Sequence, residues 1–175
     1  MVNHRPDRQS LLIDKHQRAF YLLYKQDTRY FATEPSEGFI ASLKNNCPSI
    51  VVRQCAASCI PLPDSSVRLI VAAQCFHWFA NEPSLKEIHR VLIPGGVFAM
   101  VWNHKDSRIP WVKQSQDIAL SYFTEDTPRA LDYKWKTAIE NFSGFASGEN
   151  LFLSGIHLKV RIKEFMNKIN KLFID

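Results

Sequence analysis

The sequence predicts an α/β fold with a mostly parallel sheet. Residues 67–73 and 97–102 are two apolar runs of strand length, and a stretch with helical spacing over residues 84–93 joins them. Parallel strands require a crossover of this kind, which is usually a helix. Two further strand-like runs, residues 29–33 and 50–54, are also joined by a helical pattern. We therefore expect the same strand–helix–strand unit to occur twice.

The first half of the chain predicts a helix followed by two short strands. Apolar side chains within Gln9–Lys25 fall on one helical stripe, which predicts a helix and no strand before Arg29. Pro35 ends the strand that begins at Arg29, and Ser36 is placed to cap the helix that follows. Its apolar face is expected to carry Phe39, Ile40 and Leu43.

The second half predicts a buried sheet centre and a helical cover. The loop at residues 61–66 leads into the apolar run 67–73, and Gly95 or Gly96 is expected to supply the positive φ that ends the next helix. Residues 111–142 read as helical with a break at Thr127-Pro128. The tail has apolar side chains at helical spacing over residues 162–173. That stripe is expected to pack on the parent domain, with an anionic membrane surface or a partner groove as alternatives.

Composition indicates an ordinary cytoplasmic globular protein. The chain has 175 residues, of which 46% are hydrophobic and 22% charged, enough for one domain with a substantial core. The net charge of +5 is concentrated in the termini and does not form a basic face with aromatics, so no nucleic-acid binding is expected. The polar N-terminus and the absence of a long apolar run argue against secretion or membrane insertion. The four cysteines lack paired metal-site spacing, so buried reduced thiols and no metal are expected.

Four short motifs occur together in the order expected of one known family. They are Glu34-Pro35-Ser36, Pro61-Leu62-Pro63-Asp64, Gln74-Cys75-Phe76-His77-Trp78 and Arg90-Val91-Leu92-Ile93-Pro94-Gly95-Gly96. The combination resembles a class I S-adenosylmethionine-dependent methyltransferase of the methyltransferase type 11 kind, near the trans-aconitate methyltransferase-like small-molecule branch. The resemblance implies an incomplete Rossmann-like domain over residues 29–145. It leaves an atypical helical segment at residues 1–28 and a divergent amphipathic tail at residues 146–175.

The resemblance also implies a cofactor site for S-adenosylmethionine. Glu34 aligns with the acid that holds the cofactor ribose, as carboxylates after a strand do in nucleotide-binding sheets. The alternative is a surface acid that stabilises a helix N-terminus. Ala57 and Ser58 are expected to contact the adenine through backbone groups, and Ile60 through apolar packing. Gln74 is expected beside the methionine portion of the cofactor.

A substrate pocket is implied at the end of the buried strand. Its expected residues are Phe76, His77, Trp78 and Trp102. No catalytic residue is assigned from the sequence. His77 is a candidate for a catalytic base, because its ordinary pKa lies near physiological pH. Pocket lining and plain packing between aromatics are the alternatives for His77.

One feature of the family is absent from the sequence. No glycine occurs before Gly38, although the family places a glycine-rich cofactor loop after its first strand. We therefore expect a shortened methyltransferase that acts on a small molecule with weak or no activity. The alternative is a non-catalytic remnant that serves as a binding or regulatory module. With the central strand missing, we expect either direct pairing of the strands at residues 29–33 and 67–73 or an exposed edge covered by the basic termini, and a protein that is marginally stable or oligomerises.

Overall fold

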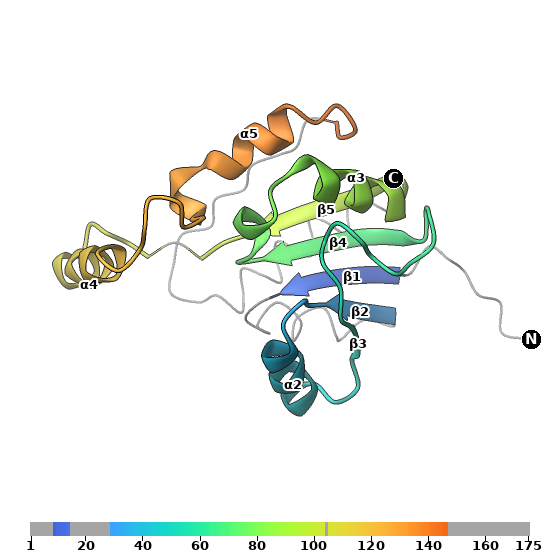
Figure 1. Cartoon of the computed structure of the whole chain (residues 1–175), viewed down its shortest axis with the longest axis horizontal. Helices are drawn as coiled ribbons and strands as arrows, with labels where there is room; N and C mark the ends of the chain where they lie inside the picture. The colour runs from blue at the N-terminus through green and yellow to red at the C-terminus, as the bar shows by residue number, and fades with distance from the viewer. Residues whose placement is uncertain (1–8, 15–28, 104, 147–175) are drawn as a thin grey trace, which may run out of the picture.

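A computed structural model describes residues 9–14, 29–103 and 105–146, and its core is a five-stranded parallel sheet (Figure 1). The strand order is β3-β2-β1-β4-β5. Every strand pair is parallel, which confirms the α/β fold with a parallel sheet. The strands are β1 (Gln9–Asp14), β2 (Arg29–Thr33), β3 (Val51–Arg53), β4 (Val67–Ala73) and β5 (Leu92–Val101).

The central strand is present, contrary to the prediction from the sequence. β1 lies between β2 and β4, with Leu11 opposite Phe31 on one side and Ile70 on the other. The helix predicted over Gln9–Lys25 is therefore wrong for Gln9–Asp14, and the remainder of that prediction lies outside the described residues. A short apolar run fits either a helix or a strand by periodicity alone. Here the backbone groups of β2 and β4 supply hydrogen-bond partners on both sides of Gln9–Asp14, and these partners favour a strand over a helix.

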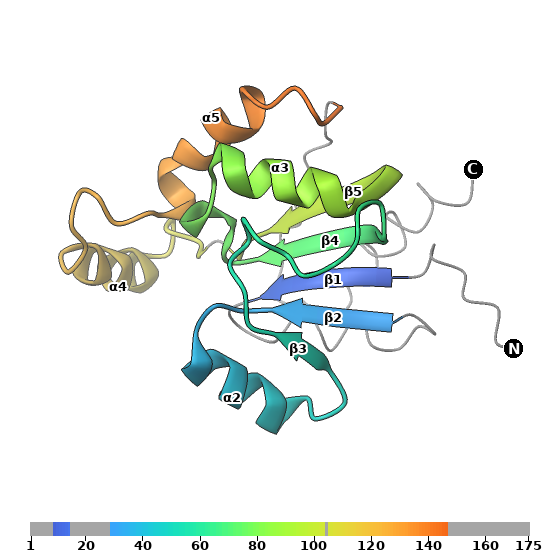
Figure 2. The ribbon, with the colours of Figure 1, turned by 45° about the vertical axis from the view of Figure 1, so that its right-hand side comes forward.

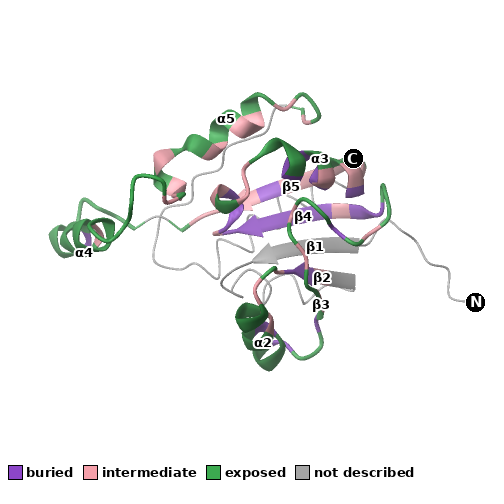
Figure 3. Cartoon of the chain, viewed as in Figure 1, coloured by how far each residue is buried: buried purple, intermediate pink, exposed green. Residues whose placement is uncertain are grey.

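Helices lie against β4 and β5 and beside β3 (Figure 2), and β4 is buried along most of its length (Figure 3). On one face, Ile70 and Ala72 of β4 pack with Leu85 and Ile88 of α3 (Glu82–Val91). On the other, the neighbouring β4 residues belong to a second cluster with Leu43 of α2 (Glu37–Asn46). Because β4 is buried on both faces, its residues are apolar except for the half-buried Arg68 and do not alternate with polar ones.

Helix α3 passes into β5 without the turn expected at Pro94-Gly95-Gly96. β5 already begins at Leu92, and the register against β4 shifts between Val67 and Leu69. Gly95 has a φ of +74°, as expected for one of the two glycines. A Cβ at Gly96 would lie 2.9 Å from the Ile93 carbonyl oxygen, so the close approach there requires glycine.

The residues after β5 form a helical cover with a longer break than expected. Helix α4 (Pro110–Leu120) is followed by a 3₁₀ turn, η3 (Ala130–Asp132), and by α5 (Lys134–Glu140). A second 3₁₀ turn, η2 (Phe76–Trp78), follows β4 and contacts α5. The predicted amphipathic helix at residues 162–173 lies outside the described residues.

Two other features concern the cysteines and the lengths of the helices. All four cysteines are free thiols, with Cys47 and Cys75 buried and Cys59 exposed. Among the helices of the described residues, none has the length and apolarity to cross a membrane.

Candidate functional site

The carboxyl ends of all five strands meet at one edge of the sheet. Asp14 at the end of β1 is opposite Ala73 at the end of β4, and Ala73 is in turn opposite Val101 of β5. At the β2–β3 pair, Thr33 is opposite Arg53. Open α/β sheets bind their ligands in the crevice outside this edge. The side chains that follow the strands here are therefore the candidates for a site.

Glu34 lies directly after β2, next to the central strand. Its N–H donates to the Arg53 carbonyl oxygen at 3.2 Å, which fixes its backbone at the sheet edge. Its carboxylate accepts the Ser36 N–H at 2.9 Å, so Glu34, and not the Ser36 side chain, caps helix α2. A carboxylate has about four lone-pair sites, so this bond leaves acceptor capacity for ribose hydroxyls. Both functions expected for Glu34 are compatible with this geometry.

The loop after β3 offers backbone donors at the same edge. The Cys59 N–H bonds the Ala56 carbonyl oxygen at 3.1 Å and closes a turn. In the described part of the chain, the N–H groups of Ala57 and Ser58 have no backbone partner. Ser58 is exposed and Ala57 half-buried. The two amides predicted to contact a ligand are thus placed where a ligand could accept from them.

Ile60, predicted to pack against the adenine, lies in the core in this structure. Its side chain is only 2% exposed and belongs to the core cluster. Its N–H donates to Glu87 at 2.7 Å, and its carbonyl oxygen accepts from Arg90 at 3.0 Å. Both backbone groups are therefore occupied within the protein. This placement favours a role in holding the loop over direct contact with a ligand.

Glu87 and Arg90 of helix α3 form a clamp on the segment that contains Ile60. The Arg90 guanidinium makes bonds of 2.7 and 2.8 Å to the Glu87 carboxylate and a third of 3.0 Å to the Leu62 carbonyl oxygen. It also pairs with Asp64. The hydrogen bond from Arg90 holds the pKa of the Glu87 carboxyl below its usual range. Asp64 and Arg90 belong to two separate sequence motifs, and the fold brings these two residues together as an ion pair.

Cys55 lies in the same loop, and its thiol has a raised pKa. Burial, and to a smaller extent the nearby Cys59 thiol, raises the pKa of Cys55 to about 11. Thiols react as thiolates, so this environment lowers the reactivity of Cys55 at neutral pH.

Gln74 has a backbone conformation that few residues with a side chain adopt. It follows β4 with a φ of +61°, in the left-handed region, and its N–H donates to the Val101 carbonyl oxygen at 2.8 Å. A left-handed conformation costs roughly 1–2 kcal/mol for an L-residue. Strain of this kind concentrates at binding and active sites. Gln74 thus lies at the sheet edge, and its position beside the cofactor stays a prediction.

The aromatic residues after β4 and β5 divide into core and surface. Phe76 is fully buried and packs edge-to-face against Phe79 and Phe98, so its side chain belongs to the core. Trp78 is 50% exposed. Trp102 stacks on Trp135 with ring centroids 4.4 Å apart.

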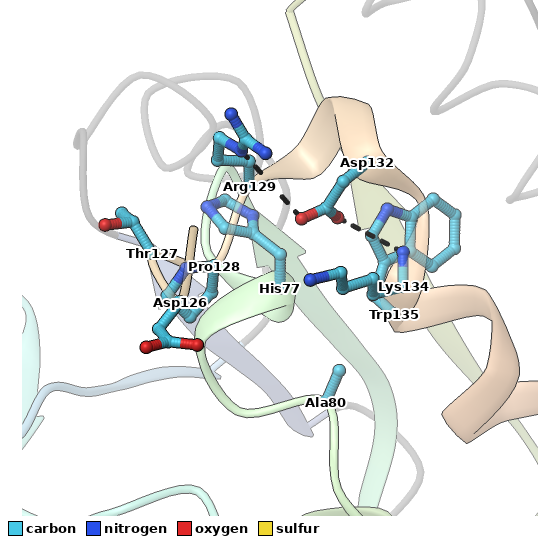
Figure 4. A pocket seen from close by; sticks show the side chains of 9 residues that line it. All are labelled: His77, Ala80, Asp126, Thr127, Pro128, Arg129, Asp132, Lys134 and Trp135. Atoms are coloured by element: carbon cyan, nitrogen blue, oxygen red, sulfur yellow. Dashed lines mark hydrogen bonds and ion pairs between the residues drawn. The ribbon is translucent and has the colours of Figure 1, made fainter. Parts of the chain in front are cut away.

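A cavity of about 200 Å³ lies beside η2, beneath the segment that leads into α5 (Figure 4). Of the four predicted pocket residues, only His77 lines it. The sequence did not predict the charged residues of the lining, because the break at Thr127-Pro128 is the one feature of this segment that its sequence indicates. The lining residues are His77, Ala80, Asp126, Thr127, Pro128, Arg129, Asp132, Lys134 and Trp135.

The orientation of His77 is fixed by Trp102. The Trp102 indole N–H donates to His77 Nδ1 at 3.2 Å. A neutral imidazole has one donor and one acceptor nitrogen, so its proton is then on Nε2. Nδ1 is the basic nitrogen of this tautomer, and a general-base role would require the bond from Trp102 to break. The geometry favours pocket lining for His77.

A parallel sheet of strand order β3-β2-β1-β4-β5 with crossover helices defines a Rossmann-like α/β fold. The family model for a methyltransferase domain (type 11) matches residues 16–100. This part of the chain belongs to the class I S-adenosylmethionine-dependent methyltransferases, and the family predicted from the motifs is confirmed.

Individual relatives agree with this assignment. A methyltransferase-like protein of Schizosaccharomyces pombe is 42% identical over 107 residues, which cover 61% of this chain and 40% of the relative. The chain thus spans well under half of that relative. The YcgJ protein of Bacillus subtilis has a similar fold, with a TM-score of 0.55 and 16% identity over 78% of this chain and 61% of its own. So does a Methanococcus maripaludis protein assigned as an S-adenosyl-L-methionine-dependent methyltransferase, with a TM-score of 0.50 and 18% identity over 95% and 69%.

Proposed function

We propose that this chain binds S-adenosylmethionine at the carboxyl edge of its sheet and transfers the methyl group to a small molecule held in the cavity beside His77. The observation that carries the proposal is the position of Glu34, directly after β2 and next to the central strand. The residues present fit the group: the carboxylate retains acceptor capacity for the ribose, and the N–H groups of Ala57 and Ser58 are available to the adenine.

The chain's own residues have a limited task in this reaction. When bound, the cofactor supplies a methyl group that is already activated by its sulfonium. Glu34 and the backbone of Ala57 and Ser58 would hold one end of the ligand, with Gln74 next to its reactive portion. His77, fixed by Trp102, would border the acceptor. Methyl transfer then depends on alignment in a site that excludes water, and a catalytic acid is not required.

Turnover is expected to be weak. Residues 15–28 contain no glycine, and glycine is the residue that lets a backbone approach a ligand most closely. The second candidate function, a non-catalytic module that retains ligand binding, follows from the same observation. Nearness to the trans-aconitate methyltransferase-like branch remains part of the proposal.

Titration calorimetry with S-adenosylmethionine tests the proposal. Glu34→Ala should weaken binding about tenfold or more, because a charge-assisted hydrogen bond contributes roughly 1.5–3 kcal/mol. Glu37→Ala is the matched control: it removes an exposed acid from the first turn of the same helix, and affinity should not change. Glu34→Gln keeps an acceptor for Ser36 and separates a loss of affinity from a loss of folding.

The outcomes distinguish the candidates. Binding that depends on Glu34 and is accompanied by formation of S-adenosylhomocysteine supports the methyltransferase. Binding without turnover supports the binding module. Equal effects of the changes at Glu34 and Glu37 would refute the ribose assignment.

A further inference from the structure

The exposed apolar side chains of the described residues gather on one segment. Most of the large ones belong to residues 109–133, in and around helix α4. This helix lies beyond the carboxyl ends of the strands, away from the sheet (Figures 1 and 2), and Val112 is its only buried residue. Contiguous exposed apolar side chains of this kind mark interaction surfaces. The exposure of α4 therefore indicates that the helix takes part in association.

Three of these side chains form a stripe along α4. Trp111, Ile118 and Tyr122 are 72%, 57% and 83% exposed. Together with the exposed Ser115, they follow the alternation of four- and three-residue steps that defines a coiled-coil seam. Tyr122 comes after the last residue of α4, but its N–H donates to the Ala119 carbonyl oxygen at 3.3 Å and continues the helical turn. The stripe is thus built to pack against another helix.

The surface of α4 is electrically neutral. Its two charged side chains, Lys113 and Asp117, lie off the stripe and pair with each other at 2.6 Å. The flanking exposed positions carry the uncharged residues Gln114, Ala119 and Ser121. An anionic membrane surface recruits helices with a basic polar face, which α4 lacks. A neutral stripe instead suits an identical stripe, because no like charges meet when two copies approach.

The sizes of the side chains are also self-complementary. In an antiparallel pair with its two-fold axis between Ser115 and Ile118, each Ile118 lies against Ser115 of the second copy. Each Trp111 then lies against Tyr122 of the second copy. A parallel pair would instead oppose Ser115 to Ser115 and leave a gap beside two facing Trp111 rings. Large side chains opposite small ones fill an interface better than this.

The available area agrees with a weak dimer. The exposed parts of Trp111, Ile118 and Tyr122 offer on the order of 400 Å² per copy. With the flanking residues, two copies would bury roughly 1,000 Å², which is the lower limit of a specific interface.

We propose that α4 pairs with α4 of a second copy of this chain, antiparallel and through Trp111, Ile118 and Tyr122, to form a weak two-fold dimer. The dimer requires neither a cofactor nor turnover, so it is independent of the proposed function. The segment that lines the cavity, from Asp126 to Trp135, follows α4 closely in the chain. Dimerisation would therefore hold one end of that segment.

Sedimentation velocity of the full chain, at concentrations from about 1 µM to about 300 µM, tests the proposal; the dissociation constant should be on the order of 10–100 µM. Ile118→Asp should weaken the dimer about tenfold or more, because it places two carboxylates beside the two-fold axis. Leu120→Asp is the matched control: it adds the same charge at an exposed position of the same helix but lies off the stripe, and the dissociation constant should not change. Thermal melting of both variants shows whether the fold is retained.

A mixing experiment tests the direction of the pair. Ser115→Lys and Ile118→Asp chains, mixed in equal amounts, should associate more tightly than either variant alone. In the antiparallel arrangement the introduced lysine of one copy faces the introduced aspartate of the other, whereas a parallel arrangement keeps them apart. The absence of this gain would overturn the antiparallel pair.

A chain that stays monomeric over the whole range, or equal effects of Ile118→Asp and Leu120→Asp, would overturn the proposal. A monomer that sediments with phosphatidylcholine vesicles through Ile118 would also overturn it and would assign the stripe to a lipid surface. A dimer that depends on Ile118 in a chain that does not bind S-adenosylmethionine would support this interface while refuting the methyltransferase.

Discussion

The clamp formed by Glu87 and Arg90 predicts a large stability loss from a change far from any ligand. Arg90→Met retains the unbranched stem and removes every hydrogen bond of the guanidinium. The variant leaves the Ile60 carbonyl oxygen with only one of its two donors, the Leu62 N–H, and deprives Glu87 of its charged partner. Both effects act on groups that water reaches poorly, because the Glu87 side chain is only 16% exposed.

The expected magnitude follows from counting only the shielded partners. Asp64 is 78% exposed, so its pair with Arg90 contributes little. An acceptor that loses one of two donors costs about 0.5–1.5 kcal/mol, and a carboxylate that loses a charged partner costs about 1–3 kcal/mol. Because the Arg90 side chain is 33% exposed, water recovers part of this. We expect a loss of about 1–3 kcal/mol in the free energy of unfolding.

Urea denaturation followed by tryptophan fluorescence measures this loss as a lower midpoint at an unchanged slope. Lys86→Met is the matched control on the same helix: its ion pair with Glu82 is 66% and 69% exposed, and the midpoint should not move. A midpoint for Arg90→Met equal to that of this control would show that the clamp does not stabilise the fold.

Two further predictions concern pH and thiol reactivity. The folded-state pKa of Glu87 is lowered, chiefly by the hydrogen bond from Arg90. Its contribution to stability is therefore fully present above the unfolded pKa of about 4.3 and is lost as the pH falls through the folded value. The stability difference between wild type and Arg90→Met should shrink accordingly in acid, and a constant difference from pH 6 to pH 3 would contradict this. Iodoacetamide at pH 8 should label exposed Cys59 well before Cys55, whose pKa is about 11. Mass spectrometry of the native and the urea-unfolded protein measures the labelling of each thiol. The two thiols should react at similar rates only in the unfolded protein, and equal rates in the native protein would contradict the prediction.

The sequence was sufficient for the parts of the fold with a strong local pattern. β4 matches the predicted run Val67–Ala73 residue for residue, because a strand buried on both faces is mostly apolar and is flanked by loop residues. The crossover helices were predictable from their apolar stripes. At the site, the motif containing Glu34 and the strand end at Gln74 followed from the rule that parallel strands bind ligands at their carboxyl ends.

The errors share a physical origin in long-range contacts. The run at Leu11–Ile13 is too short to distinguish a strand from a helix, and only the neighbouring edges of β2 and β4 decide it. The cavity residues Arg129 and Lys134 have no spacing that marks them, because they reach His77 through packing of a distant segment. The contact of Ile60 with a ligand stays a prediction, and its surroundings depend on a helix almost thirty residues later, which the local sequence does not reveal.

Helix α3 connects the stability of the fold to the shape of the site. The helix exists because β4 and β5 are parallel and need a crossover. Glu87 on this helix holds the Ile60 N–H, and Ile60 is only two residues from the exposed Ser58 amide. Any movement of α3 along β4 would therefore displace the backbone donors at the carboxyl edge. A clamp of charged groups, which fixes both distance and direction, preserves that geometry better than apolar packing alone, because hydrophobic contacts are not directional.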